Sequence, residues 1–102
     1  METKSKTATY VGFCIRAGKY RAGVNAIATL KKANLILLCK SASQNTVEQV
    51  NKLAKSLKCK VLITKDVLLE EWTFKAGVKA IAITDKSLAD AIYQNRQEDF
   101  IL

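Results

Sequence analysis

Short, wholly apolar runs alternate with segments of helical period along this chain, and this alternation limits its possible folds more than any other feature. We expect strands at residues 35–39, 61–63 and 80–83, because these runs are too short for helices and are bounded by polar residues. Runs that are apolar at every position are typical of strands buried on both faces. Residues 19–22 form a further short extended segment. The pattern predicts an α/β layer structure in which helices cover both faces of a short central sheet.

Segments of helical period lie between the expected strands. The first helix is expected at residues 8–17, with Gly18 as its stop signal. The second is expected to start at Val24 and to run for about two and a half turns, with Lys31 and Lys32 near its carboxyl end. Basic residues at that end of a helix complement the helix dipole, which is a structural reason for both lysines.

Capping patterns mark the starts of the later helices. The third helix is expected to begin after Ser43 or after Asn45, since both residue types are common N-caps. A fourth helix is expected over about residues 66–77. Ser87, with Asp90 three residues later, is expected to open the last helix.

The length of the chain predicts one small domain. Its 102 residues are 49% apolar and 25% charged, which suffices for a single hydrophobic core over residues 1–102. We expect residues 1–6 and 97–102 to be frayed. No apolar run approaches the ~18 residues of a membrane-spanning helix, and no signal-peptide stretch follows the first residues. We expect a cytoplasmic protein that does not contact a membrane, and nothing in the sequence demands more than a monomer.

Positive charge is concentrated in the first two-fifths of the chain. The net charge is +8, from 17 basic and 9 acidic residues, but residues 1–40 hold eight of the basic residues and only Glu2 among the acidic ones. No acidic residue occurs between Glu2 and Glu48. A basic stretch can simply be a solvated face, but a one-sided concentration attracts phosphate more strongly than interspersed charges do. Nucleic acid is therefore the predicted class of partner.

The cysteines and the absence of histidine argue against several kinds of catalytic site. Cys14, Cys39 and Cys59 form no C-x-x-C pair, and without histidine the chain has neither a zinc-site pattern nor a Ser-His or Cys-His pair. An odd number of cysteines in apolar stretches is typical of reduced, buried thiols. The isolated glycines match neither a phosphate loop nor a dinucleotide fingerprint. We expect no enzyme activity, catalytic residue, cofactor or metal.

Three motifs in this sequence resemble those of one known family. Residues 12–23, G-F-C-I-R-A-G-K-Y-R-A-G, resemble the G-x-x-x-R-A-G-K-x-x-x-G opening of the kink-turn-binding ribosomal proteins. These form the L-seven-Ae/L-thirty-e group within a Gadd-like superfamily, and the small bacterial YlxQ-type members are the most similar. Residues 42–46, A-S-Q-N-T, resemble the family's A-S-x-N-T motif, and I-T-D-K at residues 83–86 resembles its last strand-to-helix corner. The resemblance extends over about residues 7–92.

The resemblance implies a three-layer α-β-α sandwich with a short four-stranded mixed sheet. It also implies binding to ribosomal or other structured RNA that is sharply bent at tandem sheared G·A pairs. In that family the junction of the first strand with the second helix reads the RNA, and a loop after the third strand packs on a flipped-out base. The implied RNA-binding residues are Lys19, Arg21, Gly23, Val24 and Asn25 at the junction, Lys31 and Lys32 as outer phosphate contacts, and Leu69 at the base.

The chain departs from the family pattern in both RNA-binding regions. Ala26 and Thr29 stand where the family has Glu and Lys, and Glu70 and Glu71 follow Leu69. Two carboxylates at an RNA surface add like-charge repulsion. The departures support an alternative function, in which a paralogue keeps the fold and acts as a protein-interaction module with only non-specific RNA affinity. Trp72 would then be either a surface anchor or a core residue.

Overall fold

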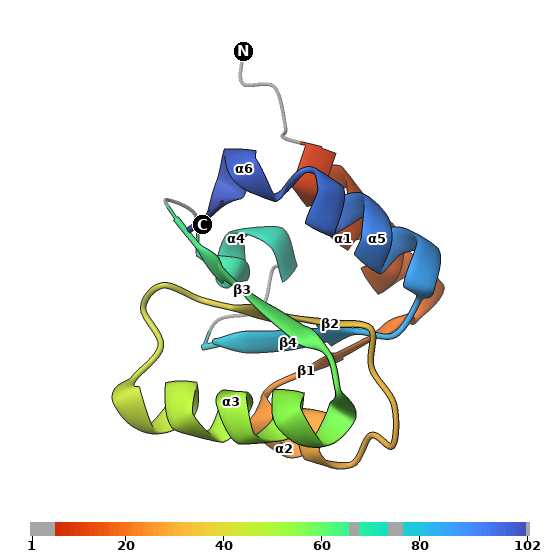
Figure 1. Cartoon of the computed structure of the whole chain (residues 1–102). Coiled ribbons are helices and arrows are strands. Elements are labelled where there is room, and N and C mark those ends of the chain that lie inside the picture. The colour runs from red at the N-terminus through yellow and green to blue at the C-terminus, as the bar shows by residue number, and fades with distance from the viewer. Residues whose placement is uncertain (1–5, 66–67, 74–76, 102) are drawn as a thin grey trace.

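The computed structural model describes residues 6–65, 68–73 and 77–101, which form one mixed five-stranded sheet with helices on both faces (Figure 1). No helix within these ranges is long and apolar enough to cross a membrane. The strands are β1 (Tyr20–Ala22), β2 (Leu35–Leu38), β3 (Lys60–Thr64), β4 (Ala80–Ile83) and β5 (Phe100–Ile101). The helices are α1 (Lys6–Ala17), α2 (Val24–Ala28), α3 (Gln44–Leu57), α4 (Leu69–Thr73), α5 (Lys86–Gln94) and α6 (Arg96–Asp99).

The strand order β1-β4-β2-β3-β5 gives the sheet two distinct ends. Strands β2 and β3 are parallel, whereas β4 runs antiparallel to both of its neighbours, β1 and β2. Strands β1, β2 and β3 therefore begin at the end of the sheet where β4 finishes. We call this the Lys19 end, after the residue that precedes β1, and we call the opposite end the Gly23 end, after the residue that follows β1.

The core lies in two layers, one on each face of the sheet. Helices α1, α4 and α5 cover one face, and α2 and α3 cover the other (Figure 1). Successive residues of β2 alternate between the layers: Leu35 and Leu37 pack with α1 and α5, whereas Ile36 and Leu38 pack with α2 and α3. All four are buried. The three-layer sandwich and the strand buried on both faces are thus confirmed.

The carboxyl-terminal segment adds a fifth strand, where four were expected. Residues 97–101 were expected to fray, but α6 directs the chain back so that Phe100 of β5 pairs with Thr64 of β3. Phe100 is only 1% exposed, and its ring meets that of Trp72 edge to face, with 5.8 Å between the centroids. The burial of this ring anchors the segment. Lys6, also expected to fray, lies in α1, whereas residues 1–5 and 102 are outside the described residues.

Helix α2 is shorter than expected. It ends at Ala28, and the Thr29 hydroxyl donates a hydrogen bond to the carbonyl of Ala26 at 2.6 Å. The chain then turns back, and the Asn34 N–H donates to the Ile83 carbonyl of β4. Pairing with the sheet therefore overrides the continued helical period. As a result, Lys31 and Lys32 lie beyond the helix rather than in its last turn.

The structure decides between the two expected caps of α3 and corrects the expected cap of α5. The Ser43 hydroxyl accepts from the Thr46 N–H and caps α3, so Ser43 and not Asn45 is the N-cap. Helix α5 is capped by Asp85, whose carboxylate accepts from the Leu88 N–H at 3.0 Å. Ser87 lies inside that helix, so its prediction as the cap was wrong. Of the helix expected over residues 66–77, the structure describes α4, and residues 66–67 and 74–76 are outside the described residues.

Candidate nucleic-acid interface

Gly23 joins β1 to α2 with a backbone conformation that favours glycine. Its φ of 91° and ψ of 149° lie in a region that side chains with a Cβ rarely adopt. The Gly23 N–H donates to the Ala80 carbonyl at 2.8 Å, and the Gly23 carbonyl accepts from the Ile27 N–H. No neighbouring atom lies within 4 Å of the place a Cβ would take. The requirement for glycine is therefore conformational, and the surface above the junction is open.

The residues on either side of Gly23 have different environments. Arg21 is exposed, and its Nη1 donates to the Tyr20 carbonyl on its own strand at 2.8 Å. Asn25 is exposed in the first turn of α2, which has no side-chain cap. Val24 is half-buried and packs against the α2 and α3 core layer. Arg21 and Asn25 are thus available to a ligand, while the Val24 side chain mainly holds α2 on the sheet.

The three other predicted basic contacts do not join this group. The Lys19 carbonyl accepts from the Thr84 N–H beyond the end of β4, which places Lys19 at the opposite end of β1 from Gly23. Lys31 and Lys32 lie in the segment that leads to the start of β2, also at the Lys19 end. All three side chains are exposed. The structure therefore divides the predicted basic residues between the two ends of the sheet.

Leu69 was predicted to pack on an RNA base, and that prediction was wrong. Its side chain is fully buried in the core layer beneath α1 and α5. Leu69 is the first residue of the short helix α4, and its burial is one of the contacts that hold α4 against the sheet. A side chain with no exposed surface cannot contact a ligand without local unfolding.

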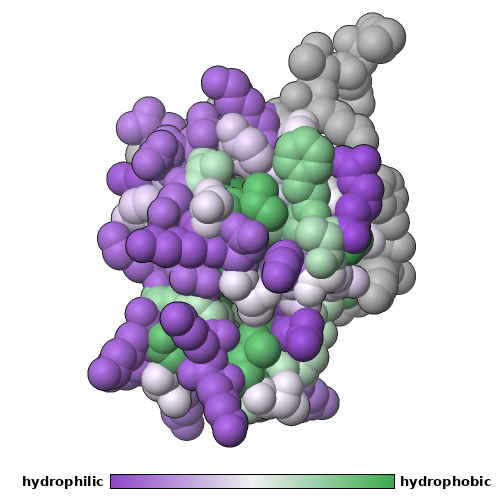
Figure 2. All heavy atoms as spheres, turned by 90° about the vertical axis from the view of Figure 1, so that its right-hand side faces the viewer, coloured by the Kyte–Doolittle hydropathy of each residue, from purple (hydrophilic) through white to green (hydrophobic). Residues whose placement is uncertain are grey.

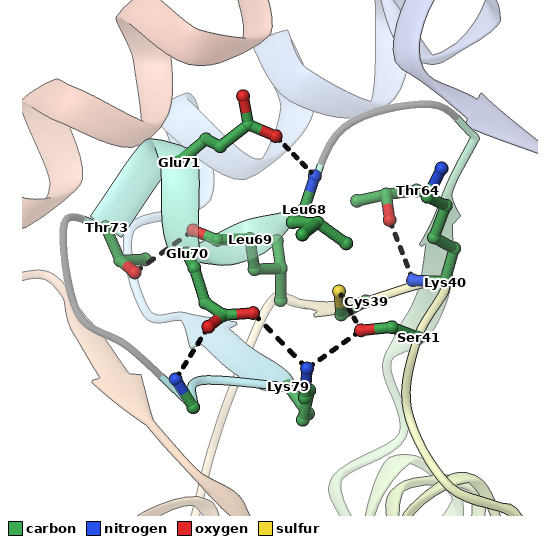
Figure 3. A network of polar contacts seen from close by, with 11 residues as sticks. Cys39, Lys40, Ser41, Thr64, Leu68, Leu69, Glu70, Glu71, Thr73 and Lys79 are labelled. Carbon is green, nitrogen blue, oxygen red and sulfur yellow. Dashed lines mark hydrogen bonds and ion pairs between the residues drawn. The ribbon is translucent and has the colours of Figure 1, made fainter.

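Glu70 and Glu71 make internal contacts instead of standing as free charges (Figure 3). One Glu70 oxygen accepts from the Gly77 N–H at 2.8 Å, and the other lies 3.2 Å from the Lys79 ammonium. The hydrogen bond from Gly77, together with the one from Lys79, lowers the pKa of Glu70. Glu71 accepts from the Leu68 N–H at the start of α4. The ion pair with Lys79 reduces the like-charge repulsion expected from Glu70, whereas Glu71 is exposed and forms no ion pair with a described cation.

Lys79, like Lys40, is a residue of the Gly23 end that was not among the predicted site residues. Its ammonium donates to the Ser41 hydroxyl at 2.8 Å as well as to Glu70 (Figure 3). Its carbonyl accepts from the Cys39 N–H, and Ala80 beside it accepts from Gly23. Lys79 therefore links α4, the end of β2 and the α2 junction. Only the pairing of β4 between β1 and β2 brings these segments together, so no local sequence signal could have found it.

The cysteines have different surroundings. Burial, with the charge of Asp85, raises the pKa of the Cys14 thiol to about 11. Burial also opposes ionisation of the Cys39 thiol, but its pKa is lowered overall. The opposing effects are hydrogen bonds from Ser41 and from the Leu69 backbone and the charge of Lys79. Cys14 and Cys39 are buried, as expected, and Cys59 is half-buried with its pKa raised by burial.

We predict that Glu70→Gln lowers the melting temperature at neutral pH. Because the pKa of Glu70 in the folded protein lies below its ordinary value of 4.5, its carboxylate stabilises the fold above that pH and ceases to do so as the pH falls through the folded pKa. The difference in melting temperature between wild type and variant should shrink as the pH falls below 4.5. Glu48→Gln, on the exposed face of α3, is the control and should leave the melting temperature nearly unchanged at each pH. A constant difference across pH would contradict the assigned contact.

Unpaired cations dominate the surface of the basic segment. Between the described residues, the single ion pair joins Lys79 to Glu70. Arg21 in the middle of β1 and Lys40 after the end of β2 are exposed without an ion pair to a described carboxylate, as are the three lysines at the Lys19 end. Exposed charges that have no counter-charge nearby attract anions.

Comparisons with known proteins support the fold and go no further. No family model matches this chain, and no curated protein matches it. Among solved structures, a protein of unknown function from Bacillus halodurans is similar, with a TM-score of 0.78 and 18% sequence identity. The match covers 93% of this chain and 100% of that one. At this identity the likeness shows a shared fold and carries no information on function.

Proposed function

We propose that this protein binds structured RNA, ribosomal or other, through the Gly23 end of its sheet. The observation that carries the proposal is the open glycine junction with exposed Asn25 in the first turn of α2, together with exposed Arg21 and Lys40, neither of which is ion-paired to a described carboxylate. Cations at such a surface bind phosphates, and a glycine junction lets a ligand approach the main chain closely. The function is a binding function, without a catalytic step.

Asn25 is the residue proposed to discriminate between RNAs. Its side-chain amide offers both donors and an acceptor, so it can pair with a base edge, whereas Arg21 and Lys40 offer only donors. Sequence-specific recognition of RNA depends on such edges where the helix is bent or opened. We therefore propose that bent RNA of the kink-turn type is bound more tightly than an unbent duplex.

The alternative function, a protein-interaction module, loses two of its supports. Trp72 is 7% exposed and packs against Phe100, so it is a core residue and not a surface anchor. Glu70 and Glu71 are engaged in contacts that hold α4. Neither observation bears on RNA directly. The presence of Trp72 and of the two acids is explained by packing and by hydrogen bonds within the protein, and it requires no protein partner.

We predict that Asn25→Ala lowers the preference for a kink-turn RNA over an unbent duplex of equal length by roughly tenfold to a hundredfold, the effect of losing one base-edge contact. Affinities for both RNAs should be measured across a range of salt concentrations, because phosphate contacts alone give equal salt slopes for the two. Asn51→Ala, on the exposed face of α3, is the matched control and should leave the preference unchanged.

Two outcomes of this experiment would contradict the proposal in different ways. Equal affinity of the wild-type protein for the two RNAs, with the same salt slope, would leave only non-specific electrostatic binding. No binding to either RNA near physiological salt would favour the interaction module.

A further inference from the structure

A surface hollow of about 250 Å³ lies at the Lys19 end of the sheet, between α5 and the starts of β2 and β3. Figure 2 views this end of the molecule and shows hydrophilic side chains gathered on the side of α5 and β3. The hollow is remote from Gly23, because it lies where β2 and β3 begin and Gly23 lies where β1 ends. Its apolar lining is Leu35, Cys59 and Ala89, and its polar lining is Asn34, Lys58, Lys60, Asp90 and Tyr93.

Tyr93 holds two cations at the edge of this hollow. The Lys60 ammonium lies 4.5 Å from the centroid of its ring and donates to its hydroxyl at 3.1 Å. The Arg96 guanidinium lies 4.0 Å from the same centroid and donates to the Tyr93 carbonyl at 2.8 Å. A ring attracts cations through its quadrupole but does not neutralise them. Neither cation forms an ion pair with a described carboxylate, so a bound anion would relieve their mutual repulsion.

Lys58 adds a third positive charge beside these two. It ends α3 in the left-handed conformation, with φ of 55°, where glycine is the usual residue. Its side chain is exposed and lines the hollow with that of Lys60, two residues later in the chain. The two lysines thus flank Cys59, which contributes to the apolar part of the lining. The hollow combines fixed positive charge with an apolar surface.

Asp90 and Asn34 indicate which kind of anion fits. A carboxylate on the lining repels a bare phosphate, but it accepts a hydrogen bond from a hydroxyl, and the Asn34 amide can donate or accept. A ribonucleotide offers both a phosphate and a ribose 2′-hydroxyl, the group that distinguishes RNA from DNA. The hollow, at about 250 Å³, is small for a ligand pocket, which favours one unit of a longer ligand over an extended stretch of it.

We propose that this hollow binds one nucleotide unit of single-stranded RNA, with its phosphate at Lys58 and Lys60 and its ribose hydroxyl at Asp90. The proposal rests on the proposed RNA-binding function and adds a second contact at the opposite end of the sheet. Lys31 and Lys32 are exposed in the segment that precedes Asn34. They extend the positive surface for the part of the RNA strand that would continue beyond the hollow. The protein would then hold a folded RNA element at one end and a flanking single strand at the other.

The test uses the full chain and three probes: a short oligouridylate, the oligodeoxyuridylate of equal length, and inorganic phosphate. The affinities of the two fluorescently labelled oligonucleotides are measured by fluorescence anisotropy. The affinity of inorganic phosphate and the location of the binding site are measured from backbone amide shifts by nuclear magnetic resonance. The oligoribonucleotide should shift the amides of Asn34, Cys59 and Lys60, and it should bind more tightly than the deoxy probe. Lys58→Ala combined with Lys60→Ala should weaken its binding by about tenfold or more, the effect of losing charge-assisted contacts.

The matched control combines Lys6→Ala with Lys52→Ala, which removes the same charge from exposed positions on α1 and α3. It should weaken binding by less than about threefold, as expected for charges that lie away from the bound anion. Asp90→Ala, which removes the acceptor together with the charge, should abolish the preference for ribose and strengthen the binding of inorganic phosphate. Equal losses in the two double variants, equal affinity for the two oligonucleotides, or amide shifts elsewhere would each overturn the proposal.

The failure of this proposal and the failure of RNA recognition at the Gly23 end are distinguishable. If the hollow is not a site, the oligouridylate leaves its amides unshifted while kink-turn RNA still binds and responds to Asn25→Ala. If recognition at the Gly23 end fails instead, the oligouridylate still binds at the hollow, and its binding is still weakened by the double replacement of Lys58 and Lys60.

Discussion

Replacing Phe100 by alanine is expected to lower the free energy of unfolding by about 3–5 kcal/mol. Phe100 is 1% exposed in the core layer shared with α1 and α5, and its ring packs edge to face against Trp72. Truncation would leave a cavity between β5 and α4 and would remove the anchor of the last strand. Since small domains are stable by only ~5–15 kcal/mol, the loss is a large share of the total.

The same strand supplies the control for this prediction. Ile101 follows Phe100 in β5 but is 54% exposed, so Ile101→Ala should change the free energy of unfolding by less than about 0.5 kcal/mol. Urea unfolding followed by the fluorescence of Trp72 measures both variants, and Trp72 also reports directly on the loss of its neighbour. Similar small effects for the two substitutions would show that the tail does not pack on the sheet.

Replacing Gly23 by alanine is expected to destabilise the protein by about 1–3 kcal/mol and to weaken the binding of kink-turn RNA. The reason is conformational, since a Cβ at this position would meet no neighbouring atom but would disfavour the φ of 91°. Relaxation of the strain would move the Gly23 N–H away from the Ala80 carbonyl and shift α2 with Asn25. Thermal unfolding measures the first effect, and RNA titration at a temperature where the variant stays folded measures the second.

Gly12→Ala is the control for glycine replacement. Gly12 lies within α1, and a Cβ there also meets no neighbouring atom within 4 Å. Alanine is the better helix former, so this variant should be more stable by about 0.5–1 kcal/mol and should bind RNA as the wild type does. A Gly23→Ala variant as stable as Gly12→Ala would show that the junction does not require glycine.

Local patterns in the sequence predicted most of the regular structure. The apolar run at residues 35–39 predicted a strand buried on both faces, and the capping residues Ser43 and Asn45 predicted the start of α3 to within two residues. Signals of this kind depend on neighbours a few residues apart. Ser87 was expected to cap the last helix, but the cap is Asp85, the residue nearer the end of β4, because the end of the strand sets where the helix can begin.

The candidate site was predicted less well, because side-chain exposure depends on packing partners distant in sequence. Leu69 was expected from the family resemblance to contact an RNA base, but the layer formed by α1 and α5 buries it. Lys31 and Lys32 were predicted as outer phosphate contacts beyond the junction, but the short α2 places them at the other end of the sheet from Gly23. Lys79 was not singled out because its partners, Ser41 and Glu70, lie 38 and 9 residues away from it.

By itself, the sequence determined the α/β class, the positions of the buried strands, the positive charge of the first 40 residues and the glycine at the end of β1. Each of these depends on composition or on the local period of side chains along the backbone. Only the tertiary structure decided the order β1-β4-β2-β3-β5, which sets Gly23 beside Ala80 and divides the basic residues between the two ends of the sheet. That order depends on hydrogen bonds and core contacts between segments far apart in the chain, and no local pattern records which strands will be neighbours.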